Sequence, residues 1–367
     1  MEDLGEWDIV VVGGGLVGMA AGYGMAREGA KVLILDASDT SYRASRGNFG
    51  LVWAQSKGAG CRDYALWTRK AVRTWPEFER DIQASAGVKV HYQSGLGIHL
   101  CLGSEELEKR TSMIEQINKL DLPDNDTHMI DRKTVKSILP GIGERVAGAS
   151  VSSYDGACQP LSLYRGLCLA AQSEGAKLVS NAKVETINPL AGGYSVISNT
   201  AKAWGVRILI AAGLSTNDLA RQFGIPKIVQ AQKGQILVTE RARQMMPAIT
   251  SSIRQTADGT ILIGDTKEDE LDDHSSGPGI ARLARRAAAL LPEISGLRVV
   301  RSWAALRVLT PDGHPVYDES PTHPGIFVAA THSGVTLASV HSGVLARWIM
   351  GGQRPPEFAS FSVQRFN

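Results

Sequence analysis

Residues 7–36 read WDIVVVGGGLVGMAAGYGMAREGAKVLILD, and this stretch decides the fold. The apolar run 7–12 has the length of a buried strand, and residues 16–28 have the composition of a helix that Gly29 would end. Residues 31–35 form a second apolar run, closed by Asp36. A strand, a glycine-rich turn, a helix and a strand in this order predict a β-α-β unit.

The turn of this unit carries the spacing GxGxxG, at Gly13, Gly15 and Gly18. Gly13 permits a tight turn, Gly15 lets the backbone approach a pyrophosphate, and Gly18 lets the helix pack closely on the strand. Asp36 is placed to accept hydrogen bonds from the ribose hydroxyls of an adenosine. The motif therefore predicts a dinucleotide site. A glycine-rich turn that binds nothing is the alternative, and the motif does not distinguish NAD from FAD.

Similar segments return in the middle and at the end of the chain. Strands are expected at 177–179, 184–187, 207–212 and 325–330, with helices over 62–85, 161–174 and 335–350. Strand-like segments at 227–239, 248–254 and 260–264, joined by turns, predict an antiparallel sheet. A helix is expected after them, over 280–290. Residues 88–92 and 97–102 also alternate as strands do, and Ser104 is expected to cap a charged helix.

The expected fold class is therefore α/β, a discontinuous Rossmann-type domain with an inserted antiparallel-sheet domain. The boundaries predicted for the nucleotide-binding domain are 1–86, 145–222 and 298–367. Those predicted for the substrate-binding domain are 87–144 and 223–297.

Composition excludes several classes of function. The 367 residues carry a net charge of +2, so nothing favours nucleic acid as a partner. The four cysteines (Cys61, Cys101, Cys158 and Cys168) show no metal-type or iron–sulfur spacing, and no metal is expected. Acidic residues stand near the N-terminus where a signal peptide would be basic, and no apolar run approaches the roughly 20 residues of a spanning helix. A cytoplasmic protein without a membrane span is expected.

Five further stretches accompany the N-terminal motif: YDGACQP (154–160), ILIAAG (208–213), QKGQI (232–236), SWAALRVLTPDGHPVY (302–317) and THSGVTLA (331–338). Together they resemble the FAD-dependent D-amino-acid oxidase and glycine oxidase family over essentially the whole chain. Members commonly show Trp-Ala-x-Leu-Arg, an Asp-Gly-x-Pro turn and His-x-Gly at the flavin, in this order. ASRGNFGLVWAQSKG (44–58) and IRQTADGTILIGDT (253–266) look most like the β-subunits of opine oxidases, the flavin subunit of hydrogen cyanide synthase and D-hydroxyproline dehydrogenases.

The resemblance implies FAD in a domain of the glutathione-reductase-like type. Sarcosine-oxidase relatives tether the flavin through a cysteine just before the Thr-Pro-Asp element, where this chain has Ala304, Ala305 and Leu306, so non-covalent binding is expected. The loop 331–336 opens a helix whose positive end suits the flavin pyrimidine; an ordinary helix cap is the alternative. The expected FAD contacts are Gly13, Gly15, Leu16, Val17, Gly18, Asp36, Ser45, Arg46, Asn48, Phe49, Gly50, Leu51, Val184, Gly213, Gly334, Val335 and Thr336.

The residues 43–58 are expected to wrap this cofactor, with the alternative of a glycine-hinged surface loop. Ser45 and Arg46 would meet anionic oxygens, Asn48 would lie near the ribityl chain, and Phe49 and Leu51 would cover the apolar ring.

The reaction implied by the resemblance is oxidation of a C–N bond beside a carboxylate, by hydride transfer from the α-carbon to flavin N5. Arg307, the arginine of the Trp-Ala-x-Leu-Arg element, is predicted to clamp the substrate carboxylate and is the catalytic candidate. Arg254, Trp53 and His332 are predicted to line the substrate pocket. The alternatives are structural: a strand arginine, a solvated cation beside a turn, a core aromatic and a histidine that orients the flavin loop.

The substrate is expected to be a small carboxylated amine, such as an opine, D-hydroxyproline, D-proline or glycine. The chain is expected to be the flavin subunit of a hetero-oligomeric dehydrogenase whose additional subunits carry the electron-transfer centres. A self-sufficient, peroxide-forming oxidase, a non-catalytic flavin-binding scaffold and an NAD-dependent Rossmann enzyme are the alternatives.

Overall fold

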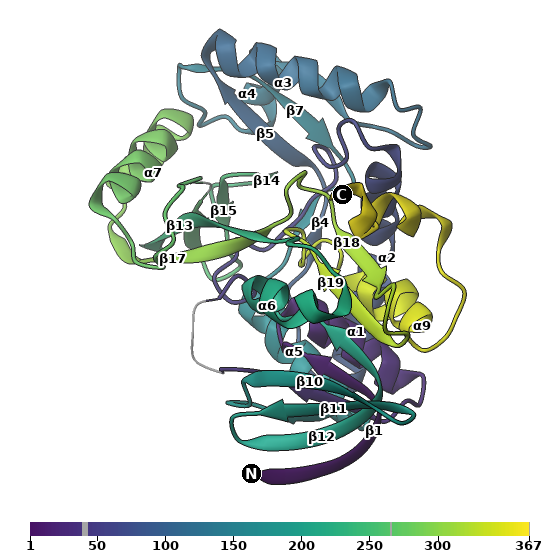
Figure 1. Ribbon diagram of the computed structural model, residues 1–367. Helices are drawn as coiled ribbons and strands as arrows, with labels where there is room; N and C mark the ends of the chain where they lie inside the picture. Colours follow the sequence, from purple (N-terminus) through teal and green to yellow (C-terminus); the bar gives the residue numbers. More distant parts are fainter. Residues whose placement is uncertain (39–42, 265, 367) are drawn as a thin grey trace.

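The computed structural model describes residues 1–38, 43–264 and 266–366. An eight-stranded sheet is built around β1 (Glu2–Val12), which lies beside the N-terminus in Figure 1. β1 pairs in parallel with β2 (Val32–Leu35) and β12 (Ala201–Ile210), and these pair in parallel with β9 (Lys177–Val179) and β19 (Ile326–Ala330), respectively. Strands from the beginning, middle and end of the chain therefore share one parallel core, which confirms the α/β Rossmann-type class.

The same sheet continues into antiparallel strands. β10 (Val184–Leu190) and β11 (Gly193–Ser198) form a hairpin that pairs with the first part of β12. β18 (Val316–Glu319) pairs with β19.

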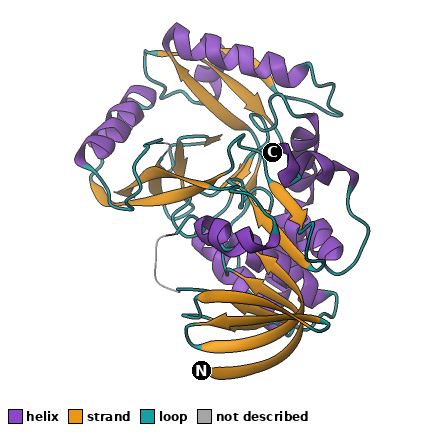
Figure 2. Cartoon of the chain, in the orientation of Figure 1, coloured by secondary structure: helices purple, strands orange, loops and turns teal. Residues whose placement is uncertain are grey.

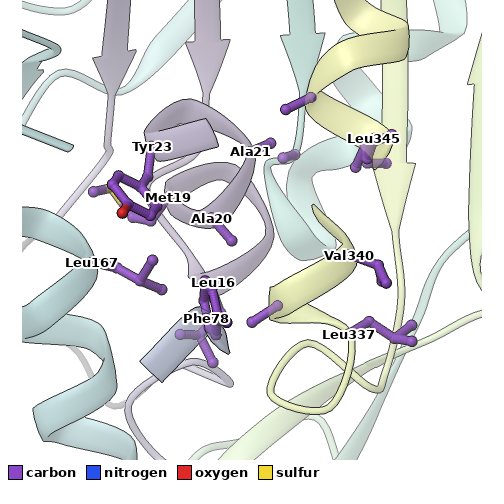
Figure 3. Packing of buried hydrophobic residues seen from close by; sticks show 14 of the residues in the cluster. Leu16, Met19, Ala20, Ala21, Tyr23, Phe78, Leu167, Leu337, Val340 and Leu345 are labelled. Atoms are coloured by element: carbon purple, nitrogen blue, oxygen red, sulfur yellow. The ribbon is translucent and has the colours of Figure 1, made fainter. Parts of the chain in front are cut away.

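Helices cover one face of the parallel strands, the face on which the helix of the first β-α-β unit packs (Figure 2). α1 (Leu16–Arg27) packs against α5 (Pro160–Ser173) and the C-terminal helical segment, and α2 (Arg62–Ala86) packs against α5. In Figure 3, Met19 and Tyr23 of α1 lie near Leu167 of α5, and Ala20 faces the segment that carries Val340. Burial of these side chains, at about 25 cal/mol per Å² of apolar surface, fixes α1 against the sheet.

Two smaller sheets lie outside the parallel core. One has the order β14-β5-β7-β6, and the other has the order β15-β16-β13-β17. The strands of the first are β5 (Gly97–Leu102), β6 (His128–Asp131), β7 (Val146–Ser152) and β14 (Ile249–Thr250). Those of the second are β13 (Gln230–Arg241), β15 (Ile253–Gln255), β16 (Thr260–Ile263) and β17 (Val299–Leu309). Their helices are α3 (Gly103–Asn118), α4 (Arg132–Ile138) and α7 (Gly277–Leu290).

A three-stranded sheet joins distant segments of the chain. It consists of β3 (Leu51–Val52), β8 (Gly156–Ala157) and β4 (Gln93–Ser94). A short helix, α6 (Thr216–Ala220), follows β12. The bounds expected from the sequence hold to within a few residues for α1, α2, α5 and α7 and for β2, β9, β16 and β19.

Three local predictions were wrong. Ser104 does not cap α3, because the helix begins at Gly103 and Glu106 Oε2 accepts from the Leu102 N–H at 2.8 Å. Residues 88–92 form no strand, since His91 takes a φ of 55°, outside the extended region. The C-terminal helix begins three residues later than expected, and it consists of α8 (Ala338–Val340), a π-helical turn (His341–Leu345) and α9 (Ala346–Ile349).

Strand pairing crosses two of the expected domain boundaries. β7, on the nucleotide side of the boundary at 145, pairs with β5 and β6. β17, on the nucleotide side of the boundary at 298, pairs with β13 over its length. Both strands belong to the antiparallel sheets by hydrogen bonding, because strand partners that are distant in sequence decide the sheet to which a segment belongs.

Candidate functional site

A cavity of about 1160 Å³ is lined by residues of the parallel core and of both four-stranded sheets. All but two of the residues predicted for the site line it; the exceptions are Gly18 and Arg254. The predicted residues in the lining are Gly13, Gly15, Leu16, Val17, Asp36, Ser45, Arg46, Asn48, Phe49, Gly50, Leu51, Trp53, Val184, Gly213, Arg307, His332, Gly334, Val335 and Thr336.

The glycine turn between β1 and α1 leaves no room for side chains. Gly13 has a φ of 109°, and a β-carbon there would fall 2.7 Å from the carbonyl carbon of Ala211. Gly18 lies behind the turn, where a β-carbon would overlap the carbonyl oxygen of Gly13 and come within 3.0 Å of Val11. The turn therefore presents bare backbone to the cavity, and Gly18 acts through packing.

Asp36 holds this turn from the end of β2. The side chain is only 2% exposed, and its Oδ2 accepts from the Gly14 N–H at 2.6 Å. Its Oδ1 accepts from the Ser38 N–H at 2.9 Å and forms an ion pair with Arg43. A buried carboxylate beside bare backbone suits the ribose and pyrophosphate of a dinucleotide.

The loop after β2 is braced by its own polar side chains. Ser45 Oγ accepts from the Leu16 N–H at 2.8 Å, at the start of α1. Asn48 donates to the Ser45 carbonyl at 2.7 Å and accepts from the Gly50 N–H at 2.8 Å. The guanidinium of Arg46 lies 4.9 Å from the ring centre of Tyr164, in a cation–π contact. The side-chain amide of Asn48, which was expected to contact the cofactor, therefore holds the loop in shape.

The C-terminal loop 331–336 is tied to the same wall. Thr336 Oγ1 accepts from the Trp53 N–H at 3.1 Å and donates to the Leu51 carbonyl at 3.3 Å. The indole N–H of Trp75 reaches the Val335 carbonyl at 3.1 Å. Trp53 is 4% exposed, so it is both part of the core and part of the cavity lining.

Arg307 reaches the cavity from β17 and lies against β13. Its Nη1 donates to the Lys233 carbonyl at 3.1 Å, and a β-carbon on Gly234 would fall 2.5 Å from its Cζ. The ammonium of Lys233 points to Glu270 at 2.7 Å and Asp272 at 2.9 Å. Arg307 is half-buried and lines the cavity, as a group that grips a carboxylate should.

His332 is exposed by its accessible surface, and it lines the cavity. Burial, together with the charges of Lys57, Arg307 and Lys267, lowers the pKa of His332 to about 3. The ring is therefore neutral at physiological pH. It can accept or donate a hydrogen bond, but it is a weak base.

Arg254 was predicted to line the substrate pocket, and the structure places it behind the lining. It is 4% exposed, and its Nη1 donates to the Cys158 carbonyl at 2.8 Å. Its guanidinium lies 5.8 Å from the ring centre of Phe49, which lines the cavity where Arg254 does not. Burial lowers the pKa of Arg254. Arg254 therefore supports the wall that Phe49 forms.

Sequence reasoning missed several residues that the fold brings to the cavity. His99 on β5 lines it, and burial beside Arg110 and Arg286 lowers the pKa of His99 to about 3. Arg110 and Glu106 reach it from α3, and Arg286 reaches it from α7. The charged pattern of 104–110 is typical of a solvated helix, so no local signal marked Arg110.

The geometry fits FAD. Bare backbone at the glycine turn, a buried carboxylate at the end of β2 and an apolar wall around Leu51 and Trp53 match the charged and the flat ends of a flavin dinucleotide. In the part of the chain that the structure describes, no three His, Cys, Asp or Glu side chains are grouped to hold a metal ion. No described helix is long and apolar enough to cross a membrane.

Comparisons with known proteins agree with this geometry. The family model described as FAD dependent oxidoreductase (DAO) matches residues 8–348. A subunit of opine oxidase from Agrobacterium tumefaciens (strain Ach5) is 39% identical over 367 residues, which cover 99% of this chain and 98% of that protein. The HcnC subunit of hydrogen cyanide synthase from Pseudomonas aeruginosa is 26% identical over 353 residues, 84% of each chain.

The fold is shared with solved structures. Glycine oxidase from Geobacillus kaustophilus superposes with a TM-score of 0.87 at 24% identity, over 98% of this chain and 99% of that chain. The resemblance seen in the sequence and the requirement for FAD are thereby confirmed. The chain belongs to the DAO family of FAD-dependent oxidoreductases.

Proposed function

We propose that this protein oxidises the C–N bond of a small amino acid or secondary-amine amino acid, as the flavin subunit of a hetero-oligomeric dehydrogenase. The observation that carries the proposal is the continuity of the cavity. Arg307 and His332 line the same space as Gly13, Asp36 and Thr336. Arg307, as the proposed carboxylate-binding residue, would therefore lie in the same cavity as the cofactor.

Each part of the lining has a task in this proposal. The turn at Gly13 and Gly15 would hold the pyrophosphate, and Asp36 would hold the ribose of the adenosine. The wall of Leu51 and Trp53 would cover the flavin ring. When bound, FAD supplies the two-electron acceptor.

The residues of the substrate side would position the amine. The forked guanidinium of Arg307 would hold the α-carboxylate by two parallel hydrogen bonds, which orients the Cα–H bond. The neutral ring of His332 can accept a hydrogen bond from the amine. Oxidation removes the α-hydrogen as a hydride and one proton from nitrogen, which leaves an imine that water hydrolyses to an oxo acid and an amine. Because His332 is a weak base, the amine would have to react in its neutral form.

The subunit role rests on the relatives. The similar proteins from opine oxidase and from hydrogen cyanide synthase are themselves named as subunits. We infer that electrons leave this chain for a redox centre on another subunit. A self-sufficient oxidase that reduces oxygen is the second candidate, because another relative, from Bacillus licheniformis, is a glycine oxidase.

Anaerobic mixing of the purified holoprotein with amino acids tests the reaction. Opine-type secondary amines, D-hydroxyproline, D-proline and glycine should be screened, with loss of the oxidised flavin absorbance as the readout. Bleaching by at least one class is expected. A flavin that none of these classes reduces would contradict the proposed reaction and favour a scaffold role.

The acceptor is tested separately. The chain alone, supplied with a reducing substrate in air, is expected to form peroxide slowly and to turn over faster once its partner subunits are added. Rapid peroxide formation in a 1:1 ratio with substrate, by the isolated chain, would identify it as an oxidase.

A further inference from the structure

A second cationic group faces the cavity, at the side formed by α3 and β5. Arg110 is 6% exposed, and it lines the cavity. Its Nε donates to Ser150 Oγ at 2.6 Å, and its Nη2 donates to Gln55 Oε1 at 2.6 Å. Among the residues that the structure describes, its Nη1 contacts only the thioether of Met113, at 3.4 Å. Neutral groups therefore hold the guanidinium of Arg110 in place, while Nη1 can still donate hydrogen bonds to a ligand.

No carboxylate among the described residues pairs directly with Arg110. Gln55 links Arg110 to Asp155, since its carbonyl accepts from Arg110 and its amide donates to Asp155 Oδ2 at 2.6 Å. Burial lowers the pKa of Arg110 to about 10, so it stays protonated at neutral pH. A buried arginine without an adjacent anion is costly, and the fold retains one here.

The surroundings of Arg110 leave the cavity positively charged. Glu106 is occupied by Arg286 through two hydrogen bonds, at 2.6 and 2.9 Å. Lys57 and Lys267 also line the cavity, and among the described residues neither has a carboxylate within ion-pair distance. The charge of Lys267 lowers the pKa of both His332 and His99, so it acts on both of these histidines of the lining.

We propose that Arg110 binds a second carboxylate of the substrate, so that the preferred substrates are amino acids whose nitrogen substituent or side chain ends in another acid group. The inference rests on the proposed function, in that Arg307 holds the α-carboxylate of the same molecule. The distance between the two arginines would then select substrates by the separation of their two carboxylates. The positive charges of Lys57 and Lys267 would attract a substrate with two negative charges. Arg110 is a specificity-determining residue in this arrangement.

Binding of unreactive acids to the holoprotein tests the proposal without turnover. The probes are linear dicarboxylates from succinate to suberate, each compared with its monoamide, which has nearly the same shape and one charge less. Dissociation constants come from the perturbation of the flavin spectrum. The wild-type protein should bind at least one dicarboxylate about tenfold or more tightly than its monoamide, as expected for a charge-assisted hydrogen bond.

Variants assign that preference to Arg110. Arg110→Gln should bring the ratio of the two dissociation constants close to one, and Arg110→Lys should keep part of it. Because the ratio compares two ligands on the same sample, it does not depend on the fraction of protein that is folded. Arg298→Gln, which removes an exposed arginine paired with Glu240, is the control and should leave the ratio unchanged.

The outcomes separate this proposal from the proposed reaction. A wild-type protein that prefers no dicarboxylate of the series, or an Arg110→Gln variant that keeps the full preference, would overturn the role of Arg110 even if the flavin is reduced by amino acids. A preference that depends on Arg110 would support the subsite even if no amino acid reduces the flavin, in which case only the reaction fails. If Arg110→Gln does not fold, Arg110→Lys decides, because loss of the forked donor should weaken dicarboxylate binding more than monoamide binding.

Discussion

The guanidinium of Arg307 lies against the bare backbone of Gly234 on the neighbouring strand. A β-carbon on Gly234 would fall 2.7 Å from Nη1 and 2.5 Å from Cζ of Arg307. Nη1 also donates to the carbonyl oxygen of Lys233 at 3.1 Å. The missing side chain at 234 thus provides the space for the guanidinium of Arg307, the proposed carboxylate clamp.

Gly234→Ala should displace the clamp and leave the fold intact. The atoms that a methyl group would meet belong to the flexible end of an arginine, which can move at low cost. Since a displacement of about 1 Å near the reaction can cost about 100-fold in rate, kcat/KM for a carboxylated amine is expected to fall roughly 10- to 100-fold. The free energy of unfolding should change by less than about 1 kcal/mol.

Steady-state kinetics and urea unfolding check this prediction. Gly141→Ala is the matched control, because its β-carbon would meet no atom within 4 Å. An unchanged kcat/KM in Gly234→Ala would show that the position of the guanidinium does not matter for the reaction.

Removal of the clamp itself should separate substrate binding from cofactor binding. Arg307→Ala is expected to lower kcat/KM by about 100-fold or more, since a charge-assisted hydrogen bond contributes about 1.5–3 kcal/mol and the fork makes two. Arg307→Lys should recover only part of the loss, because an ammonium lacks the fork. The FAD content of both variants, read from the absorbance ratio, should match that of the wild type; a colourless Arg307→Ala protein would place this residue at the cofactor instead.

Thr336 joins the C-terminal loop to the strand that covers the cavity, so Thr336→Val should loosen that wall. The substitution keeps the shape of the side chain and leaves the buried N–H of Trp53 without its partner at 3.1 Å. An unsatisfied buried donor costs about 1–3 kcal/mol. Urea unfolding should show a loss of this size, and FAD should dissociate faster on dilution. Equal stability and equal FAD release would indicate that a water molecule replaces the hydroxyl.

The fold was predictable from the sequence where its signals are local. The unit β1-α1-β2 follows from the apolar runs and the glycine spacing within 30 residues, and the bounds of α1 agree with the structure to one residue. Sheet membership was not predictable for β7 and β17, because a strand's partners lie far away in sequence. A boundary drawn from composition therefore separated strands that are hydrogen-bonded to each other.

The site shows the same division between local and distant causes. Most of the expected cofactor residues line the cavity because short motifs place them at strand ends. Arg254, which was predicted to line the pocket, lies behind the lining, and Arg110, for which nothing was predicted, lies in it. Phe49 covers Arg254, whereas Gln55 and Ser150, from two distant segments, bury Arg110 at the cavity. Whether a charged side chain is buried depends on the residues that pack over it, and the local sequence pattern does not show which residues these are.

Asp155 should make stability depend on pH between about 4 and 7. Burial raises the pKa of Asp155 to about 7 in the folded protein, against an ordinary value of 3.8. In this window the folded protein holds a proton that the unfolded chain has released. The contribution of this group to stability is therefore fully present below about pH 4 and is lost as the pH rises through about 7.

Asp155→Asn removes that titration. The free energy of unfolding of the wild type, relative to that of the variant, is expected to fall as the pH rises from 4 to 7 and to level off above 7. Urea unfolding at intervals of half a pH unit measures this difference. A constant difference for Asp155→Asn would mean that Asp155 is ionised throughout this range.

His332 lines the cavity, and its low pKa predicts that it is not the group that titrates during catalysis near neutral pH. Burial and the charges of Lys57, Arg307 and Lys267 lower its pKa to about 3, so it is neutral from pH 5 to 9. The rising limb of kcat/KM with pH should then report deprotonation of the substrate amine. His332→Asn keeps a hydrogen-bonding group, so the limb should stay within about half a pH unit of its wild-type position.

The size of the effect is as informative as its pH dependence. A general base contributes about 100- to 10,000-fold, whereas loss of one neutral hydrogen bond costs about tenfold or less. Flavin reduction in His332→Asn, followed anaerobically by stopped flow over pH 5–9, is therefore expected to slow by less than about tenfold. A limb that disappears, together with a loss of 100-fold or more, would instead make His332 the base. Its pKa would then have to be raised on substrate binding, for instance by a substrate carboxylate that neutralises Arg307.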